Sequence, residues 1–389
     1  MSGPGLRALS VPSGAAALSV LPDLRYALDG SGPAVAPHAV SSPPQPLPDD
    51  VGDLPAGLTL TIETSGSTGR PKLAMLTGAA LRASAEATHQ RLGGRGQWLL
   101  ALPAHHIAGI QVLVRSVVAG TAPICMDLAG GFTPSAFAGA TAELDTGGRA
   151  YTALVPTQLV RLLASADGCR ALTRFAAVLL GGSAAPASLL ARARGFGVAV
   201  VTTYGMSETA GGCVYDGKAL QVSRVRLEED GRIQLGGATL ARGYLGEPEL
   251  SAESFIHDGE GTDWFRTDDV GHLDGGALVV DGRLDDLINT GGLKVVPCVV
   301  EAALVQLEAI AEAIVVGSTD PEWGQVVSAA VVVAPGSAPP RLEEVRAQLR
   351  GVLPDHGLPR RLKTLAELPL RGPGKPDRAA VRRLFEHRR

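Results

Sequence analysis

Short apolar runs alternate with helical patterns from Leu58 to Arg194, and no other feature of the sequence restricts the possible folds as much. Six runs are predicted to be buried strands: Leu58–Ile62, Trp98–Leu102, Ala122–Met126, Ala150–Val155, Ala176–Leu180 and Val198–Thr202. Five stretches between them are predicted to be helices: Ala79–Arg91, Ile110–Ala119, Pro134–Glu143, Pro156–Ser165 and Ala185–Arg194. Strands separated by helices favour a parallel sheet with helices on its faces. Functional loops are then expected at the carboxyl ends of the strands.

The pattern changes twice after this alternating region. Residues 211–282 hold short strand-like runs with Gly and Asp turns, which indicates a small, mostly antiparallel β subdomain. After Leu284, helical and strand patterns over about a hundred residues indicate a compact α+β domain. We therefore predict an α/β protein with a large domain over residues 1–283, whose mostly parallel sheets are flanked by helices, and a small mobile domain over residues 284–389. The segment Ser31–Gly57 is rich in Pro and Ser and is predicted to be a loop.

The composition favours a soluble globular protein and gives no sign of a nucleic-acid or membrane partner. Hydrophobic residues make up 45% and charged residues 19% of the chain, which suits a full core. The formal net charge of -4 does not favour binding to nucleic acid or to an anionic membrane. Four widely spaced cysteines form no CxxC pair, which is typical of reduced thiols and not of a zinc site. Because neither a membrane span nor a signal peptide is recognisable, we predict a cytoplasmic protein.

Residues 64–72 read TSGSTGRPK, a polar and flexible segment directly after the apolar run Leu58–Ile62. Its glycines let backbone N–H groups turn toward an anion, and its hydroxyls and lysine add further donors. It is not a Walker A loop, because Pro71 stands where the second Gly would be and no Lys-Ser/Thr pair follows. A phosphate-binding loop is therefore predicted, with a flexible surface turn as the alternative.

Four further loops carry residue types that suit a nucleotide site, although each has a simpler interpretation by itself. They are YGMSET (204–209), FRTDDVG (265–271), GRLDDLINTGGLKV (282–295) and GPGKPDR (372–378). The Glu of the first suits Mg²⁺, and the paired acids of the second suit ribose hydroxyls. Taken alone, the four would equally fit a solvated loop acid, a turn cap, a domain linker and a surface lysine. Their order and spacing together favour a shared function.

In this order, the five motifs resemble the signature motifs of the adenylate-forming superfamily of acyl-CoA synthetases, over roughly residues 58–380. The resemblance implies an AMP-forming acid–thiol ligase that uses ATP and Mg²⁺, with CoA as a cosubstrate. A carboxylic acid and Mg·ATP would give an acyl-adenylate and pyrophosphate, and the CoA thiol would then give acyl-CoA and AMP. The alternative from another functional class is a silent nucleotide-binding relative. The presence of Glu208, Asp269 and Lys375 argues against it.

The resemblance also implies roles for individual residues of the nucleotide site. The loop around the β- and γ-phosphates would comprise Thr64, Ser65, Gly66, Ser67, Thr68, Gly69 and Lys72. The adenine site would comprise Gly181, Gly182 and Ser183 of the stretch LLGGSAAP, together with Tyr204. Glu208 would hold Mg²⁺, and Thr209 would bind the α-phosphate. Asp269 would bind the ribose hydroxyls with help from Arg283.

Further implied roles belong to the small domain. Asp285 would be the hinge about which this domain rotates, and Lys375 would approach the acyl carboxylate and the α-phosphate during adenylation only. A cation that is placed only at that step stabilises the transition state more than the ground state. Rotation would then remove the lysine and open a thiol channel lined by Gly291, Gly292 and Lys294.

Three stretches bear on the acid: LPAHHIAG (102–109), ALVPTQLVRLL (153–163) and TYGMSETAGGCVYDG (203–217). They look most like the o-succinylbenzoate–CoA ligases of menaquinone biosynthesis, with another aryl- or acyl-CoA ligase as the alternative. His106 would act on the substrate, or would only be a packed, hydrogen-bonded group. Candidates for holding the free carboxylate of the acid are His106, Thr157, Gln158 and Ser207. About 63 residues precede the phosphate loop, so we expect a pocket built from fewer elements than in similar enzymes; a homodimer is compatible with the resemblance.

Overall fold

The computed structural model describes residues 5–44, 54–64, 72–371 and 375–386. The chain forms two compact units, which are described separately. Unit 1 comprises Met1–Arg226, Gln234–Thr267 and Gly275–Leu278, and unit 2 comprises Leu227–Ile233, Asp268–Asp274 and Val279–Arg389. The continuous part of unit 2 therefore begins near the predicted boundary at residue 283, which as a functional division stays a prediction.

The largest sheet of unit 1 has seven strands in the order β11-β10-β9-β8-β7-β5-β6. They are β5 (Gln97–Leu100), β6 (Ile124–Cys125), β7 (Ala150–Leu154), β8 (Ala177–Leu180), β9 (Val200–Met206), β10 (Gly211–Tyr215) and β11 (Lys218–Ala219). Strands β5 to β9 pair in parallel, whereas β10 and β11 extend the sheet antiparallel to β9. The predicted parallel sheet is confirmed for five of its six runs.

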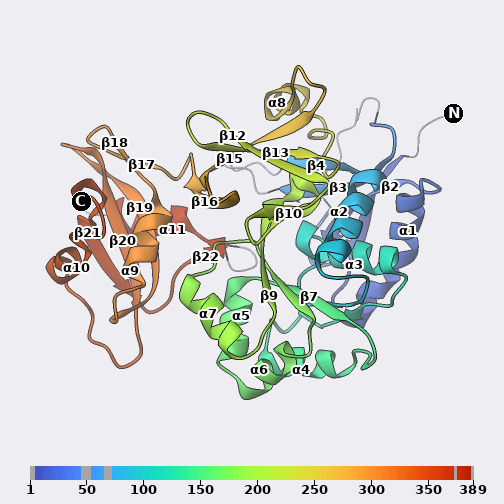
Figure 1. Ribbon diagram of the computed structural model, residues 1–389, viewed down its shortest axis with the longest axis horizontal. Helices are drawn as coiled ribbons and strands as arrows, with labels where there is room; N and C mark the ends of the chain where they lie inside the picture. Colours follow the sequence, from blue (N-terminus) through green and yellow to red (C-terminus); the bar gives the residue numbers. More distant parts are fainter. Residues whose placement is uncertain (1–4, 45–53, 65–71, 372–374, 387–389) are drawn as a thin grey trace. The chain divides into compact units, whose positions relative to one another are not determined.

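Helices cover both faces of this sheet because successive residues of a strand point to opposite faces. The helices are α2 (Gly78–Arg91), α3 (Ile107–Ala119), α4 (Pro134–Ala142), α5 (Pro156–Leu163), α6 (Ala166–Leu172) and α7 (Ala187–Gly195). Trp98 and Leu100 of β5 join an apolar cluster with α2 and α3, while Leu99 joins a second cluster with α4 to α7. Figure 1 shows these two helix groups on either side of β7 and β9. All five helices predicted for this region are confirmed.

The N-terminal sheet of unit 1 has four strands in the order β1-β2-β3-β4. They are β1 (Leu6–Val11), β2 (Ala34–Ala39), β3 (Leu58–Thr64) and β4 (Lys72–Thr77). Two expectations are corrected here. The predicted strand Leu58–Ile62 is part of β3, which lies in this sheet and not in the large one. Part of the predicted loop 31–57 is strand β2. The Pro and Ser content hid β2, although Ala34 and Val35 are completely buried.

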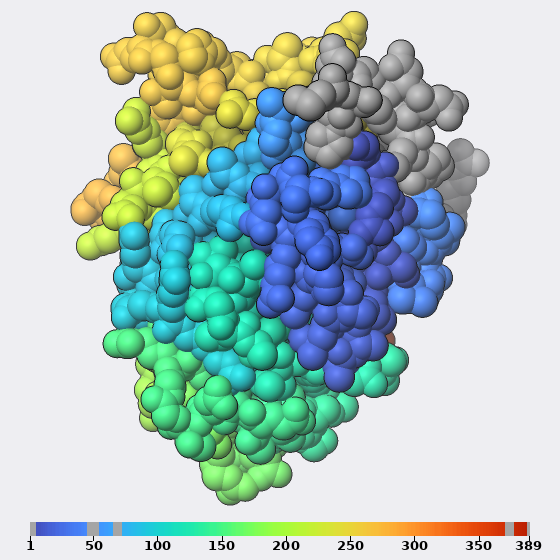
Figure 2. All heavy atoms as spheres, turned by 90° about the vertical axis from the view of Figure 1, so that its right-hand side faces the viewer, coloured from blue at the N-terminus to red at the C-terminus, as the bar shows by residue number. Residues whose placement is uncertain are grey.

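A seven-residue 3-10 helix η1 (Gly14–Val20) and helix α1 (Leu21–Asp29) connect β1 to β2. Figure 2 shows this blue N-terminal segment on the surface of unit 1 beside the cyan and teal segments of α2 and α3, which α1 contacts. The helix ends at Gly30, whose φ of 72° is the left-handed conformation that glycine adopts readily. These N-terminal elements cover the apolar cluster on the α2 and α3 face of the large sheet.

Short strands follow in the region that was predicted to be mostly antiparallel. They are β12 (Ser223–Leu227), β13 (Arg232–Gly237), β14 (Phe255–His257), β15 (Asp263–Asp274) and β16 (Ala277–Arg283), with helix α8 (Pro248–Ser254) before β14. Strands β14 and β15 pair antiparallel, with Phe255 opposite Phe265. The chain contributes residues of this region to both units.

The continuous part of unit 2 contains a sheet in the order β18-β17-β20-β19, with β21 beside β20. Its strands are β17 (Ile288–Thr290), β18 (Leu293–Val295), β19 (Ile310–Asp320), β20 (Gly324–Val333) and β21 (Arg361–Leu365), and its helices are α9 (Pro297–Leu304), α10 (Leu342–Leu349) and α11 (Arg378–Glu386). Val315 packs with α9 and α10, whereas its neighbours Ile314 and Val316 pack with α11. The predicted α+β architecture of this region is confirmed.

Candidate active site

Three of the segments predicted to hold the nucleotide and the acid lie at one edge of the large sheet. Strands β7, β8 and β9 are parallel neighbours, with Leu154 paired to Leu180 and Leu180 to Thr202. The segments that follow these strands begin at Val155, Gly181 and the 3-10 turn η2 (Ser207–Thr209). The sheet therefore brings three of the predicted segments together, although they are distant in sequence.

Backbone dominates the surface of the segment Gly181–Ser183. A Cβ at Gly181 would lie 2.4 Å from Thr203 Oγ1, and Gly182 has a φ of +84°. Neither position accepts another residue without strain, because the first has no room and the second is left-handed. Tyr204 lies on the adjacent strand β9. A flat base could hydrogen-bond to the backbone of this segment, and the Tyr204 ring stays the predicted stacking partner.

The turn Ser207–Thr209 is buried, and Glu208 is only 7% exposed. The Tyr244 hydroxyl donates to Glu208 Oε1 at 2.9 Å, and the Ala241 amide donates to the Glu208 carbonyl at 2.8 Å. The Thr209 hydroxyl donates to the Gly211 carbonyl at 2.8 Å and accepts from the Met206 amide at 3.0 Å. In this conformation the turn uses the Thr209 hydroxyl, so its predicted phosphate contact requires a rearrangement. Glu208 instead has a carboxylate held in place by a neutral donor.

Ala210, directly after this turn, has a left-handed backbone with a φ of 51°. Its carbonyl accepts hydrogen bonds from Ser84 Oγ at 3.0 Å and from Gln111 Nε2 at 2.6 Å. Such a conformation is costly for alanine and persists where the surroundings enforce it. Helices α2 and α3 therefore fix the turn that presents Glu208. Sequence reasoning missed Ser84 and Gln111, because nothing in their local pattern distinguishes them from core polar residues.

The phosphate loop connects two antiparallel strands, with Thr64 paired to Lys72. Ser65, Gly66, Ser67, Thr68 and Gly69 lie outside the described residues. Lys72 Nζ lies 5.1 Å from the centre of the Tyr244 ring, within the range of a cation–π contact. The loop therefore joins two strands, unlike the strand-to-helix loop of a Walker A motif.

Tyr244 connects two predicted site residues and was not recognised in the sequence. Its ring faces Lys72, its hydroxyl holds Glu208, and the residue is buried. Backbone hydrogen bonds of 2.9 Å from Met75 to Gly243 and from Leu245 to Leu73 fasten this segment along β4. The only local signal is a Tyr after a Gly, which is too common to indicate a site.

His106 lines a cavity of about 230 Å³ in unit 1. The cavity wall also includes His38, His105, Glu63 and Leu73, so the flanks of the phosphate loop and the predicted substrate histidine border one space. The ring centres of His105 and His106 are 4.3 Å apart. Burial and the nearby His38 lower the pKa of His105, which favours a neutral ring at pH 7. The cavity therefore offers imidazole groups that can act as hydrogen-bond donors.

Gln158 is hydrogen-bonded at both ends of its side-chain amide, and its role as a substrate anchor stays a prediction. Its Nε2 donates to the Ala101 carbonyl at 2.8 Å, and its Oε1 accepts from the Val155 amide at 3.0 Å. Both ends of the amide thus serve the first turn of α5, and the side chain is buried. A residue three positions into a helix commonly satisfies the free amides there. Thr157, next to it, is half-buried, and Ser207 is buried in the adjacent turn.

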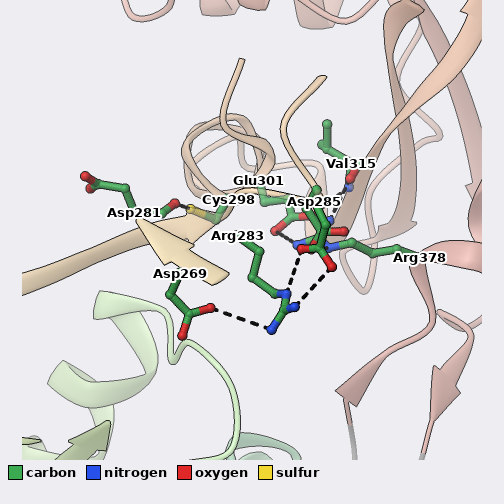
Figure 3. Close-up of polar contacts among 9 residues, drawn as sticks. Asp269, Asp281, Arg283, Asp285, Cys298, Glu301, Val315 and Arg378 are labelled. Carbon is green, nitrogen blue, oxygen red and sulfur yellow. Dashed lines mark hydrogen bonds and ion pairs between the residues drawn. The ribbon is translucent and has the colours of Figure 1, made fainter. Parts of the chain in front are cut away.

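The predicted ribose and hinge residues meet in unit 2, as Figure 3 shows. Arg283 donates to both carboxylate oxygens of Asp285 at 2.8 and 3.0 Å, and its Nη1 lies 3.8 Å from Asp269 Oδ1. Burial lowers the pKa of Arg283, but its hydrogen bonds to Asp285 and the charges of Asp285, Asp269 and Asp268 raise the pKa above its ordinary value overall. Arg283 therefore stays cationic between the hinge and the acid predicted to bind ribose.

Two of the predicted thiol channel residues lie in the tight turn between β17 and β18, and the third, Lys294, lies on β18. Gly291 and Gly292 have φ values of 58° and 82°, and a Cβ at Gly291 would lie 2.6 Å from Trp323 Cε3. The guanidinium carbon of Arg360 lies 4.2 Å from the centre of the Trp323 ring. Sequence reasoning missed this stacked pair, while exposed Lys294 was included.

Lys375 lies on β23 (Lys375–Pro376), which pairs antiparallel with β22 (Leu370–Arg371). Its backbone faces that of Arg371, while its side chain is outside the description. The approach of this lysine to a substrate therefore stays a prediction.

The donor chemistry at Glu208 fits Mg²⁺. The metal prefers carboxylate, phosphate and water oxygens and seldom needs several protein ligands. The described residues contain no group of three or more His, Cys, Asp or Glu that could hold a metal. Within the same residues, no helix has the length and apolarity to cross a membrane. All four cysteines are free thiols, and burial raises the pKa of Cys213 to about 12.

Comparisons with known proteins identify the family of this chain. The AMP-binding enzyme family matches residues 31–233, and the AMP-binding enzyme C-terminal domain matches residues 299–375. A probable 2-succinylbenzoate–CoA ligase of Mycobacterium tuberculosis is 46% identical over 389 residues, covering 98% of each chain. A 2-succinylbenzoate–CoA ligase of Listeria innocua is 32% identical over 81% of this chain and 68% of its own length.

Solved structures share the fold. The amide bond synthetase McbA from Marinactinospora thermotolerans is 23% identical, with a TM-score of 0.79 over 99% of this chain and 90% of its own. The o-succinylbenzoate CoA synthetase MenE from Bacillus subtilis, solved with the acyl-adenylate intermediate OSB-AMP, is 24% identical, with a TM-score of 0.74 over 97% and 88%. The chain therefore belongs to the family of AMP-binding enzymes, as its ordered motifs predicted.

Proposed function

We propose that this chain is an AMP-forming ligase that converts 2-succinylbenzoate to its CoA thioester through an acyl-adenylate, a step of menaquinone biosynthesis. One observation carries the choice of acid: the relative from Mycobacterium tuberculosis aligns from end to end at 46% identity. The similarity extends over both matched domains and is not confined to the motifs that all members of the family share. A cytoplasmic location and a homodimer stay predictions.

The first half-reaction uses the edge of the large sheet in unit 1. Gly181, Gly182 and Tyr204 would hold the adenine, and the phosphate loop would hold the pyrophosphate that leaves. Glu208 would hold Mg²⁺, which neutralises charge on the phosphates when it is bound. Tyr244 supports this assignment, because one buried side chain orients the Glu208 carboxylate and faces the Lys72 ammonium. Attack of the acid on the α-phosphate would then proceed with the Glu208 carboxylate and the Lys72 ammonium already in position.

The second half-reaction requires the cation to leave. We propose that Lys375 supports adenylation only, and that rotation about Asp285 then exposes the turn Gly291–Gly292 to the CoA thiol. Both glycines are exposed and carry no side chain, which favours this role because the backbone of the turn is accessible. Asp269 and Arg283 would keep the ribose in place through both steps, supported by the ion pairs around Arg283.

For the free carboxylate of the acid, the cavity beside His106 is the best-placed site. Its imidazole groups can donate hydrogen bonds, whereas the Gln158 amide already makes two hydrogen bonds to backbone groups. Thr157 and Ser207 complete the set of proposed anchors from the adjacent loops. Glu63 lines the same cavity, and its carboxylate would repel a substrate carboxylate at close range. Its proposed role is therefore to orient a histidine ring and not to bind the acid.

The assignment is tested with purified protein, Mg·ATP, CoA and a panel of aryl, dicarboxylic and fatty acids. We expect thioester and AMP to form with 2-succinylbenzoate at least tenfold faster, in kcat/KM, than with any other acid, about 1.4 kcal/mol of discrimination. The variant Glu208→Gln is the negative control, because it keeps the shape but removes the metal-binding charge. Rapid thioester formation with a different acid, and none with 2-succinylbenzoate, would reject the substrate while leaving the reaction class intact.

A further inference from the structure

Two adjacent acids at the predicted hinge have different arginine partners. Asp285 binds Arg283 at the end of β16, whereas the next residue, Asp286, binds Arg378 Nε at 3.1 Å. Arg378 is the first residue of α11, three positions after Lys375. All of these residues belong to unit 2. The peptide between Asp285 and Asp286 therefore separates two charge clusters, which Figure 3 shows side by side.

Arg378 is held from three directions. Its Nη1 and Nη2 donate to Glu301 of α9 at 2.5 and 3.1 Å, a bidentate arrangement, and Nη1 also donates to the Val315 carbonyl of β19 at 2.6 Å. Glu301 Oε1 in turn accepts from the Val315 amide at 2.7 Å. Bidentate arginine–carboxylate pairs fix geometry as well as contributing energy. The guanidinium thus joins α9, β19 and the hinge-adjacent acid at one point.

The strand that carries Lys375 is fastened immediately beside this point. Asp377 donates its amide to the Pro369 carbonyl at 2.9 Å, closing the base of the β22–β23 hairpin. The Asp377 carboxylate accepts from the Ala380 amide at 2.9 Å and so caps α11. The backbone of Lys375 is therefore attached through two bonded residues, Asp377 and Arg378, to the body of unit 2.

We propose that Arg378 is a positioning residue, which locks the Lys375 hairpin to Asp286 so that the hinge and the lysine move as one piece. This inference rests on the proposed adenylation by Lys375. A rotation about Asp285 places the lysine reproducibly only if the hinge and the hairpin are rigidly connected. Small misplacements of a catalytic group, even those caused from a distance, cost large factors in rate.

The test uses the full chain with Asp286→Asn, which removes the charge next to the hinge but keeps the size of the side chain and the Arg378–Glu301 pair. The matched control is Asp258→Asn in unit 1, where the acid also pairs with an arginine at 3.1 Å and has similar exposure. Lys375→Ala is the reference for loss of the lysine. Three quantities are measured: acid-dependent ATP–pyrophosphate exchange, thioester formation from preformed acyl-adenylate, and hydrogen exchange of the backbone amides in β22, β23 and Asp377.

We expect Asp286→Asn to slow pyrophosphate exchange on the order of 10- to 100-fold in kcat, with KM for ATP changed less than twofold. Thioester formation from acyl-adenylate should fall less than threefold, and hydrogen exchange should increase in the hairpin but not in β19 or β20. Asp258→Asn should leave both half-reactions within twofold of the wild type. Equal losses in both half-reactions, or hairpin exchange like that of the wild type, would overturn the inference. If the wild type itself shows no acid-dependent exchange, the proposed function fails instead.

Discussion

Two arginines with little solvent contact, one in each unit, are stabilised in opposite ways. Arg115 of α3 is 3% exposed; its guanidinium lies 5.0 Å from the centre of the Trp98 ring and 3.4 Å from the Tyr215 hydroxyl. Within the described part of the chain it forms no ion pair with a carboxylate, and its Nε has no hydrogen-bond partner. Arg378 is 20% exposed at its side chain and is bound by the carboxylates of Glu301 and Asp286.

This difference appears in their protonation equilibria. Burial lowers the pKa of Arg115, and only the Tyr215 hydroxyl opposes that effect. Burial also lowers the pKa of Arg378, but hydrogen bonds and charge from Glu301, with the charge of Asp286, raise it above the ordinary value overall. Removing Arg115 therefore leaves no stranded charge, whereas removing Arg378 leaves two partly buried acids without their cation. Burial of an arginine does not by itself predict how much the protein depends on it.

The largest effect is expected for Arg378→Met. Loss of one partner from a buried ion pair is strongly destabilising, because the remaining charge is not compensated. We expect the free energy of unfolding of unit 2 to fall by about 3 kcal/mol, near the low end for buried pairs because these side chains keep some exposure. Chemical denaturation monitored by Trp323 fluorescence measures this loss.

The double variant Arg378→Met with Glu301→Gln is the control for that explanation. Neutralising Glu301 removes one of the two uncompensated acids, so at least a third of the lost stability should return. If the double variant is less stable than the single one, packing of the arginine stem and not its charge is the cause.

An intermediate effect is expected at low pH in the Arg115 cluster of unit 1. His89 is buried beside Trp98, whose Nε1 donates to His89 Nε2 at 3.2 Å. Burial, and then the charge of Arg115, lower the pKa of His89 from 6.5 to about 4. Between these two values the unfolded chain binds the proton and the folded chain does not, so stability falls as the pH drops below about 6.5. We expect unit 1 to lose about 2 kcal/mol between pH 8 and pH 5 from this group.

His89→Gln keeps an acceptor for the Trp98 indole but cannot titrate. The pH dependence of unfolding, followed by Trp98 fluorescence, should therefore become flatter by about that amount below pH 6.5. His257→Gln, at an exposed position on β14, is the control for the exchange of a histidine for glutamine. An unchanged slope in His89→Gln would assign the acid sensitivity to other groups.

The smallest effect is expected for Arg115→Met. Replacing a buried charge by an apolar side chain of similar length is often neutral, provided that no partner is left behind. Tyr215 keeps its hydrogen bond to the Thr88 hydroxyl at 3.0 Å, so the cluster stays satisfied. We expect the free energy of unfolding to change by less than about 1 kcal/mol, and an increase in stability would also agree with this prediction. A loss similar to that of Arg378→Met would remove the distinction between the two arginines.

Residues with a local pattern were predictable, whereas residues defined by a distant partner were not. The helical spacing of Ala79–Arg91 is recognisable in a short window, and the structure confirms this helix. Tyr244 reads as an ordinary turn tyrosine, because its partners Lys72 and Glu208 are far away in sequence. Gln158 was predicted as a polar pocket residue for the same reason: its two backbone partners, at Ala101 and Val155, become visible only in the folded chain.

The sequence by itself determined the alternating strands and helices, the α+β character of the C-terminal region and the family, because these depend on local periodicity and on motif order. Only the tertiary structure decided that β3 leaves the large sheet for a separate one, that helices α2 and α3 hold the turn carrying Glu208, and that Arg378 is bound to Asp286. The physical reason is that charge and hydrogen-bond partners are selected by distance in space. A single chain records which groups it contains, while the fold determines which of them are close enough to interact.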